Sequence, residues 1–206
     1  MTFLVDGSLG GTFPSWTTAT RPASPAVGQM GYNTTIGQFD SYTSGGWVSV
    51  ATTTSTSNKI TTSQMPTGTI LQVVNALYAT GVSTTSGTLS DTGLTATITP
   101  TSATSKILVL VNQNGGVKTS GTGNNSIQLY LFRNSTGISA ISERAGLTTN
   151  SIDMYLETLS VSYLDSPATT SAVTYKTQYA TFAPGNIIYL QLVGCNSTIT
   201  LMEIAA

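Results

Sequence analysis

Three carboxylates lie near one another in the sequence: Glu143, Asp153 and Glu157. A glycosidase uses two acids that flank the bond it cleaves. Residues four apart share one face of a strand, so Asp153 and Glu157 are the pair that could perform this chemistry. The alternative is that these side chains are solvated or form ion pairs with Arg133 or Arg144. We favour this alternative because nothing else in the chain supports catalysis, and we expect a non-enzyme without catalytic residues.

Histidine is absent from the chain, and Cys195 is its single cysteine. Histidine is the commonest general base and the commonest transition-metal ligand, and a lone cysteine excludes intrachain disulfides and Cys-x-x-Cys redox chemistry. Cys195 ends an apolar, strand-like run, so we expect it to be a small buried hydrophobic side chain. We therefore expect neither a metal site nor a cofactor.

Hydroxyl groups dominate the polar part of the chain, since 39 Thr and 25 Ser stand among 206 residues while 7% are charged. A hydrophobic content of 39% at a net charge of -1 favours a folded chain. Seven scattered basic residues among eight acids form no basic patch, so we expect no nucleic-acid partner. No apolar run reaches the ~18 residues of a membrane helix, and the first residues lack a signal-peptide pattern. We expect no membrane insertion and a soluble chain made in a reducing cytoplasm.

Short runs rich in Thr, Val, Ile and Tyr, bounded by Gly, Asn, Ser and Pro, predict an all-β fold. Composition divides the chain into an N-terminal zone over residues 1–51, a Thr/Ser-rich linker over 52–67 and a large domain over 68–206. Because β-branched threonines stiffen a backbone, we expect the linker to be a semi-extended stalk.

The N-terminal zone is expected to form a small β-meander with strands at 29–32, 38–42 and 47–51, separated by turn-forming residues. A three-stranded sheet of this size is marginally stable alone. We therefore expect it to pack against a neighbouring subunit or a larger surface, and to attach the protein to its assembly. The candidate attachment residues are Phe3, Phe13, Trp16 and Trp47.

The large domain contains about eight strand candidates, which is close to the number in a jelly roll. We expect strands at 70–78, 94–99, 106–113, 127–133, 154–164, 172–182, 187–193 and 198–204. The segments 106–111 and 199–204 are apolar at consecutive positions, so a second layer or another subunit must cover each face. Because almost no charged residue protects the strand edges, the domain is expected to form a closed symmetric oligomer.

Candidate binding residues lie on several strands and in one predicted loop. Tyrosines could stack on sugars, or they could fill the sandwich with their hydroxyls at its edge; they are Tyr130, Tyr155, Tyr163, Tyr175, Tyr179 and Tyr189. The Gly/Asn-rich segment 112–125 is the better candidate for a receptor-binding loop, and its alternative is an ordinary connection. Its candidate contact residues are Asn114, Asn124 and Asn125.

Several motifs together resemble known virion proteins. Residues 20–35, TRPASPAVGQMGYNTT, with Gly37-Gln38-Phe39 and Gly46-Trp47-Val48, resemble a module common in fibre and virion proteins of tailed bacteriophages, and residues 7–14, GSLGGTFP, resemble the start of short phage fibre-like proteins. The segments TGLTATITP (92–100), SKILVLV (105–111), YLDSP (163–167) and ITLMEI (199–204) resemble a C-terminal domain found in cyanophage and aquatic phage genomes.

This resemblance implies a jelly-roll-like, tumour-necrosis-factor-like domain that forms a homotrimer about its C-terminal strand. The implied interface residues are Ile199, Leu201, Met202, Glu203 and Ile204. Three copies of Glu203 near a symmetry axis would raise one another's pKa or recruit a cation; the alternative is a rim position that faces water.

Two non-enzymatic functions and one enzymatic function follow from these observations. A trimeric capsid decoration, or cement, protein on the virion surface, made in the host cytoplasm and bound to the major capsid protein, is the first. The second is a short tail fibre or head fibre that binds a host-surface glycan, and the third is an enzyme acting on polysaccharide. The missing histidines and scarce acids disfavour the enzyme. Sixteen linker residues span at most ~55 Å and the chain has no heptads for a shaft, so we favour decoration.

Overall fold

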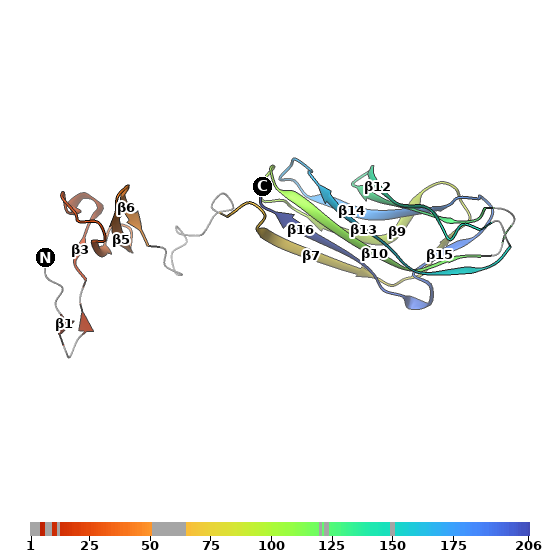
Figure 1. Cartoon of the computed structure of the whole chain (residues 1–206), viewed down its shortest axis with the longest axis horizontal. Helices are drawn as coiled ribbons and strands as arrows, with labels where there is room; N and C mark the ends of the chain where they lie inside the picture. The colour runs from red at the N-terminus through yellow and green to blue at the C-terminus, as the bar shows by residue number, and fades with distance from the viewer. Residues whose placement is uncertain are drawn as a thin grey trace. The chain divides into compact units, whose positions relative to one another are not determined.

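The computed structural model describes residues 5–6, 10–11, 13–50, 65–119, 121, 124–148 and 151–206. The chain forms two compact units, Met1–Thr61 and Thr62–Ala206; Figure 1 colours the chain by residue number and labels many of its strands. The division falls within the linker predicted at 52–67, of which residues 52–64 lie outside the described part. Among the described residues, no helix has the length and hydropathy needed to span a membrane.

The N-terminal unit contains a four-stranded sheet in the order β3-β4-β5-β6 and a separate pair, β1-β2. The strands are β1 (Val5–Asp6), β2 (Gly10–Gly11), β3 (Ser15–Trp16), β4 (Met30–Asn33), β5 (Gln38–Thr43) and β6 (Gly46–Ser49). The three predicted strands of the meander are confirmed as β4, β5 and β6. Strand β3 is an addition, and it pairs in parallel with β4.

A buried carboxylate holds the segment around β3 onto this sheet. Asp40 is fully buried, and its Oδ2 accepts hydrogen bonds from Asn33 Nδ2 at 2.8 Å, Arg21 Nε at 2.9 Å and Trp16 Nε1 at 3.3 Å. Ser49 Oγ donates to Oδ1 at 3.1 Å. Burial alone would raise the pKa of Asp40, but the hydrogen bonds from Arg21, Asn33, Trp16 and Ser49 outweigh it and lower this pKa.

The C-terminal unit is a jelly roll. Its strands are β7 (Ile70–Tyr78), β8 (Val82–Thr84), β9 (Ser90–Ile98), β10 (Lys106–Lys118), β11 (Ile127–Arg133), β12 (Thr136–Ala145), β13 (Met154–Asp165), β14 (Val173–Thr181), β15 (Ile188–Leu190) and β16 (Ser197–Ile204). Without the short β8 and β15, eight strands remain, and they pair antiparallel as first with eighth, second with seventh, third with sixth and fourth with fifth. A hairpin of eight strands rolled into two sheets has this pairing.

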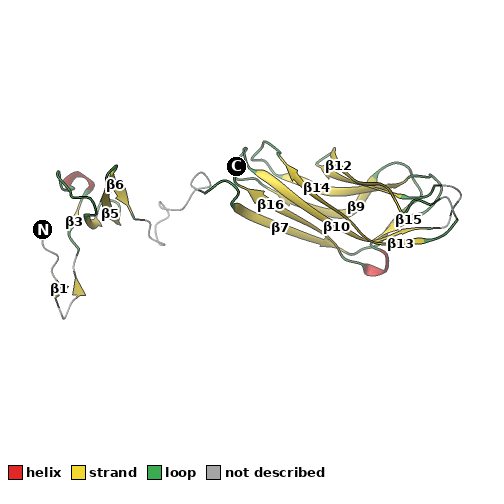
Figure 2. Cartoon of the chain, in the orientation of Figure 1, coloured by secondary structure: helices red, strands yellow, loops and turns green. Residues whose placement is uncertain are grey.

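Two antiparallel sheets enclose the core (Figure 2). One is the four-stranded sheet β12-β11-β14-β9, and the other has six strands, with β10 between β13 on one edge and β16 and then β15 on the other. Fully buried aliphatic side chains such as Ile107, Val109, Leu131 and Leu201 fill the space between the sheets. The predicted all-β sandwich is confirmed by this arrangement.

All eight predicted strand segments overlap observed strands, but one of them, 187–193, does not supply one of the eight strands of the roll. The segment 187–193 contains β15, a short addition, and then η4 (Leu192–Gly194). The missing eighth strand is β12, which the sequence pattern did not reveal. Its register against β11 shifts three times, so apolar and polar residues do not alternate regularly along it.

An ion pair joins the two sheets at one end of the roll. Arg133 Nη1 donates to both oxygens of Asp165, at 2.9 and 3.0 Å, and the fully buried Tyr175 donates its hydroxyl to Asp165 Oδ2 at 2.6 Å. Burial and this hydrogen bond raise the pKa of Tyr175. The network satisfies the charge of Asp165 where β13 ends.

The position of Glu203 corrects both alternatives proposed from the sequence. Its side chain is fully buried within one chain; Oε1 accepts from Thr101 N at 2.7 Å and Thr101 Oγ1 at 2.8 Å, and Gln72 Nε2 donates to Oε2. Burial would raise the pKa of Glu203, but these hydrogen bonds outweigh it and lower this pKa. Glu203 therefore fixes the connection between β9 and β10, and faces neither water nor a symmetry axis.

The hydrogen bonds to Asp40 predict acid-sensitive folding of the N-terminal unit. Because the pKa of Asp40 is lower in the folded than in the unfolded chain, ionised Asp40 stabilises the unit at neutral pH, and this contribution is lost as the pH falls below the ordinary value of about 4. Both tryptophans lie in this unit, so tryptophan fluorescence reports on it alone. We expect its urea midpoint to fall between about pH 5 and about pH 3.

Substitution of Asp40→Asn should lower the free energy of unfolding at pH 7 by about 1–3 kcal/mol and flatten this pH dependence. Asp6→Asn is the matched control, because Asp6 and Asp40 are the only carboxylates in Met1–Thr61, and it should leave the pH dependence in place. An unchanged pH profile in Asp40→Asn would contradict the assignment.

Candidate functional site

The two outer faces of the jelly roll differ in chemistry. On the four-stranded sheet, Lys176 Nζ lies 2.8 Å from Asp91 Oδ1, and the hydroxyls of Thr97 and Thr174 hydrogen-bond at 2.8 Å. Charged and hydroxyl groups of this kind are well solvated, so this face is suited to water.

The outer face of the six-stranded sheet carries a row of apolar side chains across four strands. Leu164 on β13 pairs with Leu108 on β10, Leu108 pairs with Met202 on β16, and Met202 pairs with Val73 on β7. Leu164 is 51% exposed and Val73 is 54% exposed. We call these four residues the apolar row. Three steps between strands make it about 14 Å long.

The residues predicted at a trimer interface divide between the two faces of β16. Met202 and Ile204 are half-buried and lie on the outer face, where a partner could reach them. Ile199, Leu201 and Glu203 alternate with them and are fully buried in the protomer. The interface predicted from the sequence is therefore corrected for these three, because they pack inside one chain.

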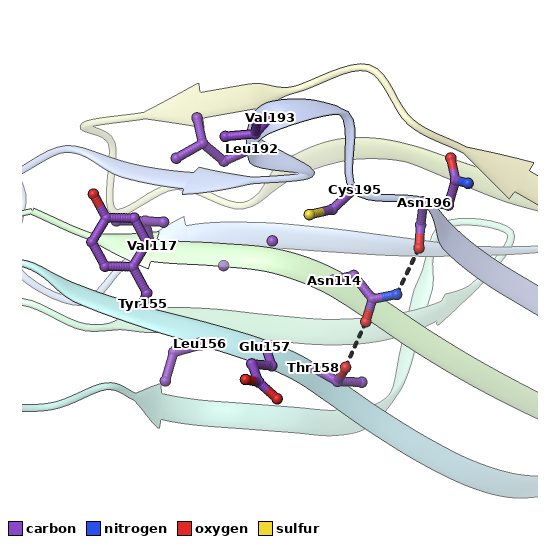
Figure 3. A pocket seen from close by; sticks show the side chains of 12 residues that line it. Asn114, Val117, Tyr155, Leu156, Glu157, Thr158, Leu192, Val193, Cys195 and Asn196 are labelled. Atoms are coloured by element: carbon purple, nitrogen blue, oxygen red, sulfur yellow. Dashed lines mark hydrogen bonds between the residues drawn. The ribbon is translucent and has the colours of Figure 1, made fainter.

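A groove of about 570 Å³ lies further along the same face, between β10, β13 and η4 (Figure 3). It is lined by Asn114, Gly115, Gly116, Val117, Tyr155, Leu156, Glu157, Thr158, Leu192, Val193, Cys195 and Asn196. Asn114 lies six residues beyond Leu108 on β10, about 20 Å along the strand. The groove and the apolar row are therefore separate surfaces on one sheet.

A glycine allows η4 to approach β10 at the floor of the groove. Gly115 has φ +63°, and a Cβ added there would lie 2.7 Å from the backbone nitrogen of Leu192 and 2.9 Å from Cβ of Cys195. Both the left-handed conformation and the close approach require glycine. Gly115 thus determines how closely η4 can pack.

The polar side chains of the groove are held in place by hydrogen bonds. Asn114 Nδ2 donates to the carbonyl of Asn196 at 2.6 Å, and Thr158 Oγ1 donates to Asn114 Oδ1 at 2.7 Å. Figure 3 places Tyr155 at the opposite end of the groove from Asn114, and Glu157 beside Thr158. Tyr155 is 73% exposed.

Strain accumulates in the segment that forms the upper wall of the groove. Gln191 and Val193 both have left-handed backbones, at φ 51° and 59°, and Val193 is 94% exposed. The left-handed region is a genuine outlier for a β-branched residue. The carboxamide of Gln191 is fully buried and has no hydrogen-bond partner within the described part of the chain. Such features are costly and concentrate at functional sites.

The thiol of Cys195 is exposed and lines the groove. This corrects the expectation of a buried residue. The sequence pattern placed Cys195 at the end of a strand, but β15 ends at Leu190 and η4 turns the chain outward before it.

Half of the predicted receptor loop at 112–125 is strand, because β10 continues to Lys118. Asn114 does reach the groove. Asn125 is buried, and its amide bonds the carbonyl of Thr119 and the hydroxyl of Thr181, so it is a structural residue. Asn124 is exposed and lies outside the groove lining.

The structure separates the two carboxylates considered for glycosidase chemistry, because only one of them lines the groove. Glu157 lines the groove, and Asp153 precedes β13 outside its lining. Within the described ranges, no group of three or more His, Cys, Asp and Glu residues could hold a metal ion.

Of the candidate tyrosines, Tyr175 and Tyr179 are buried in the sandwich, whereas Tyr155 is exposed.

The predicted attachment residues occupy different environments. Trp16 is buried in the N-terminal unit, where its ring meets Trp47 at 5.1 Å, so it is a core residue. Trp47 is half-buried, Phe13 is 48% exposed, and Phe3 lies outside the described residues.

The sequence did not reveal an apolar face on the opposite side of this small sheet. Phe39 contacts the rings of Phe13 at 5.1 Å and Tyr32 at 5.5 Å, and Met30 and Val48 both pair with Ser41 beside it. We call Phe13, Met30, Tyr32, Phe39 and Val48 the apolar face of the N-terminal unit. All but Phe39 are exposed.

The chain resembles known proteins at the level of solved structures. No family model matches the chain, and no curated protein matches it significantly. Among solved structures, the VP2 subviral particle of infectious bursal disease virus matches with 15% identity and a TM-score of 0.41, over 65% of this chain and 32% of that chain. The D431N mutant VP2 of the same virus matches with 13% identity and a TM-score of 0.35, over 89% and 49%. The chain thus spans a third to a half of these proteins, and its jelly-roll assignment rests on the strand pairing.

Substitution of Gly115→Ala should destabilise the jelly roll and open the groove. The left-handed backbone costs about 1–2 kcal/mol, and the clash with η4 should add about 1–3 kcal/mol. Gly185→Ala is the matched control, because Gly185 has φ +95° and nothing within 4 Å of an added Cβ. Urea unfolding by circular dichroism and the reaction rate of Cys195 with a thiol reagent measure both effects. Equal losses in the two variants would show that η4 does not pack tightly against Gly115.

Proposed function

We propose that this protein is a non-enzymatic structural protein of a tailed-phage virion, and specifically a trimeric capsid decoration protein on the capsid exterior. The observation that carries the proposal is the apolar row on the outer face of the jelly roll. The motifs that resemble phage virion proteins support the virion assignment, and the two-unit organisation fits a part that attaches and a part that projects.

A second copy of the chain is the occupant that fits the apolar row. From Lys106 to Asn112 on β10, and at the positions paired with these on β16 and β7, Lys106 is the only charged residue on the outer face. Apart from Lys106 no charge on this face opposes association, so copies of the chain can bury it around a shared axis. The trimeric number of subunits comes from the resemblance.

The apolar face of the N-terminal unit is the proposed contact with the major capsid protein. A unit this small leaves apolar side chains exposed because its sheet has one covered face, and a capsid surface would bury the other. This assignment replaces Trp16 as a contact residue and keeps Phe13.

A second candidate function is a short tail fibre or head fibre that binds a host-surface glycan. The groove favours it, because an exposed tyrosine beside fixed amides is suited to recognition of a ligand. In this case, the chain would be present in far fewer copies.

Charge placed on the apolar row should dissociate the oligomer. Val73 and Leu164 are more than half exposed in the protomer, so Val73→Lys and Leu164→Lys should leave the core intact while burying a lysine at the interface. We expect a trimer for the wild type and a monomer for the double variant by light scattering after size exclusion. Ile152→Lys, at another exposed apolar residue, should remain trimeric. A monomeric wild type would overturn this part of the proposal.

Copy number in purified virions tests the location. We expect quantitative mass spectrometry to give a count proportional to the major capsid protein, and we expect a chain lacking Met1–Ala51 to fold but not to incorporate. A few copies per virion would instead favour the fibre. Incorporation of the truncated chain at wild-type level would contradict attachment through the N-terminal unit.

A further inference from the structure

We propose that the groove between β10, β13 and η4 binds a neutral pyranose unit of a glycan. The inference rests on the proposed function only for the exterior location of the domain. The volume of the groove, about 570 Å³, lies within the range of small-molecule sites. The lining combines an aromatic ring, amides, a hydroxyl and one carboxylate.

Tyr155 provides the stacking surface. Its side chain is 73% exposed although it lies on a strand paired with Val117, and it stands at one end of the groove (Figure 3). The C–H groups of a pyranose carry partial positive charge, and the face of an aromatic ring carries partial negative charge, so the two attract. Exposure of this ring leaves its face free for a sugar.

Asn114 provides directional recognition of hydroxyl groups. One of its N–H groups and one lone pair are already used by Asn196 and Thr158, so its orientation is fixed. One N–H and one lone pair remain, and a sugar hydroxyl both donates and accepts. A fixed amide binds a hydroxyl at lower entropic cost than a mobile one.

Charge determines which sugars fit. Glu157 is the only charged residue in the lining, so a uronic or sialic acid would meet a carboxylate without a compensating cation. The hydroxyls of a neutral sugar can donate hydrogen bonds to the Glu157 carboxylate. The groove is therefore expected to accept neutral pyranoses and to reject acidic ones.

The strained wall supports a binding function. Gly115 lets η4 approach closely, and Val193 and Gln191 adopt left-handed backbones to form the wall. No residue of this segment belongs to the hydrophobic core clusters or to the apolar row, although Gln191 is buried. The left-handed backbones of Gln191 and Val193 therefore serve to form the groove, and not to pack the core.

The test is a glycan array probed with the full-length chain, carrying glucose, galactose, mannose and N-acetylglucosamine glycans together with uronic- and sialic-acid glycans. We expect retention on neutral glycans only. Calorimetry with the best-retained neutral glycan should show binding weakened about tenfold or more in Tyr155→Ala, as for loss of one stacked ring, and within about threefold of wild type in Tyr155→Phe.

Two further measurements locate the binding. Since Cys195 is the only cysteine and lines the groove, its alkylation by iodoacetamide should slow several-fold in saturating glycan. Thr97→Ala, on the exposed face of the four-stranded sheet, should bind as the wild type does. Tyr155 is exposed, so loss of binding in Tyr155→Ala would not reflect misfolding, and an unchanged circular dichroism melt verifies this.

Three outcomes would overturn the proposal: no glycan retained by the wild type, retention of acidic glycans only, or undiminished binding by Tyr155→Ala. Slower alkylation of Cys195 at higher protein concentration without any glycan, together with an empty array, would assign the groove to contacts between copies instead. None of these results depends on virion copy number, so failure here is distinct from failure of the proposed decoration role.

Discussion

The long strand β10 is the constraint on which the C-terminal unit depends. The backbone groups along both of its edges need hydrogen-bond partners. Strand β13 pairs with one edge from Ile107 to Lys118. No single strand follows the other edge. β16 pairs with it from Lys106 to Asn112, and β15 pairs with Val117 and Lys118. The groove lies at this change of partner, where Gly115 and η4 fill the gap in the ladder.

The same strand connects the core to the surface. Ile107, Val109 and Val111 are buried between the sheets, while Leu108 lies on the outer face and contributes to the apolar row. A strand with apolar residues on both faces needs a cover on both faces. The four-stranded sheet covers one, and a second copy of the chain is the proposed cover for the other. Thr, Ser and Asn side chains surround the row, and Lys106 is the one charged residue among the paired outer positions of β10, β16 and β7.

The N-terminal unit is stabilised in a different way, because it is too small for a large apolar core. A single buried carboxylate, Asp40, replaces part of that core by collecting hydrogen bonds from four side chains. The Trp16 ring packs close against β4 because Gly31 has no Cβ; one placed there would lie 2.2 Å from the ring. This polar core leaves aromatic and aliphatic side chains on the opposite face, so the feature that lets the unit fold also leaves it an exposed apolar surface.

Local sequence determined the all-β class and the positions of most strands, because period-two alternation and turn residues act over a few neighbouring positions. Composition alone excluded histidine chemistry, since the chain has no histidine. Tertiary structure alone decided that β12 and not β15 completes the roll, that Ile199, Leu201 and Glu203 point inward, and that Cys195 is exposed. Alternation separates two faces of a strand, but long-range pairing decides which face is covered. The groove joins Asn114, Tyr155 and Cys195 from three distant segments. No local pattern could bring them together, because only the change of partner along β10 places those segments side by side.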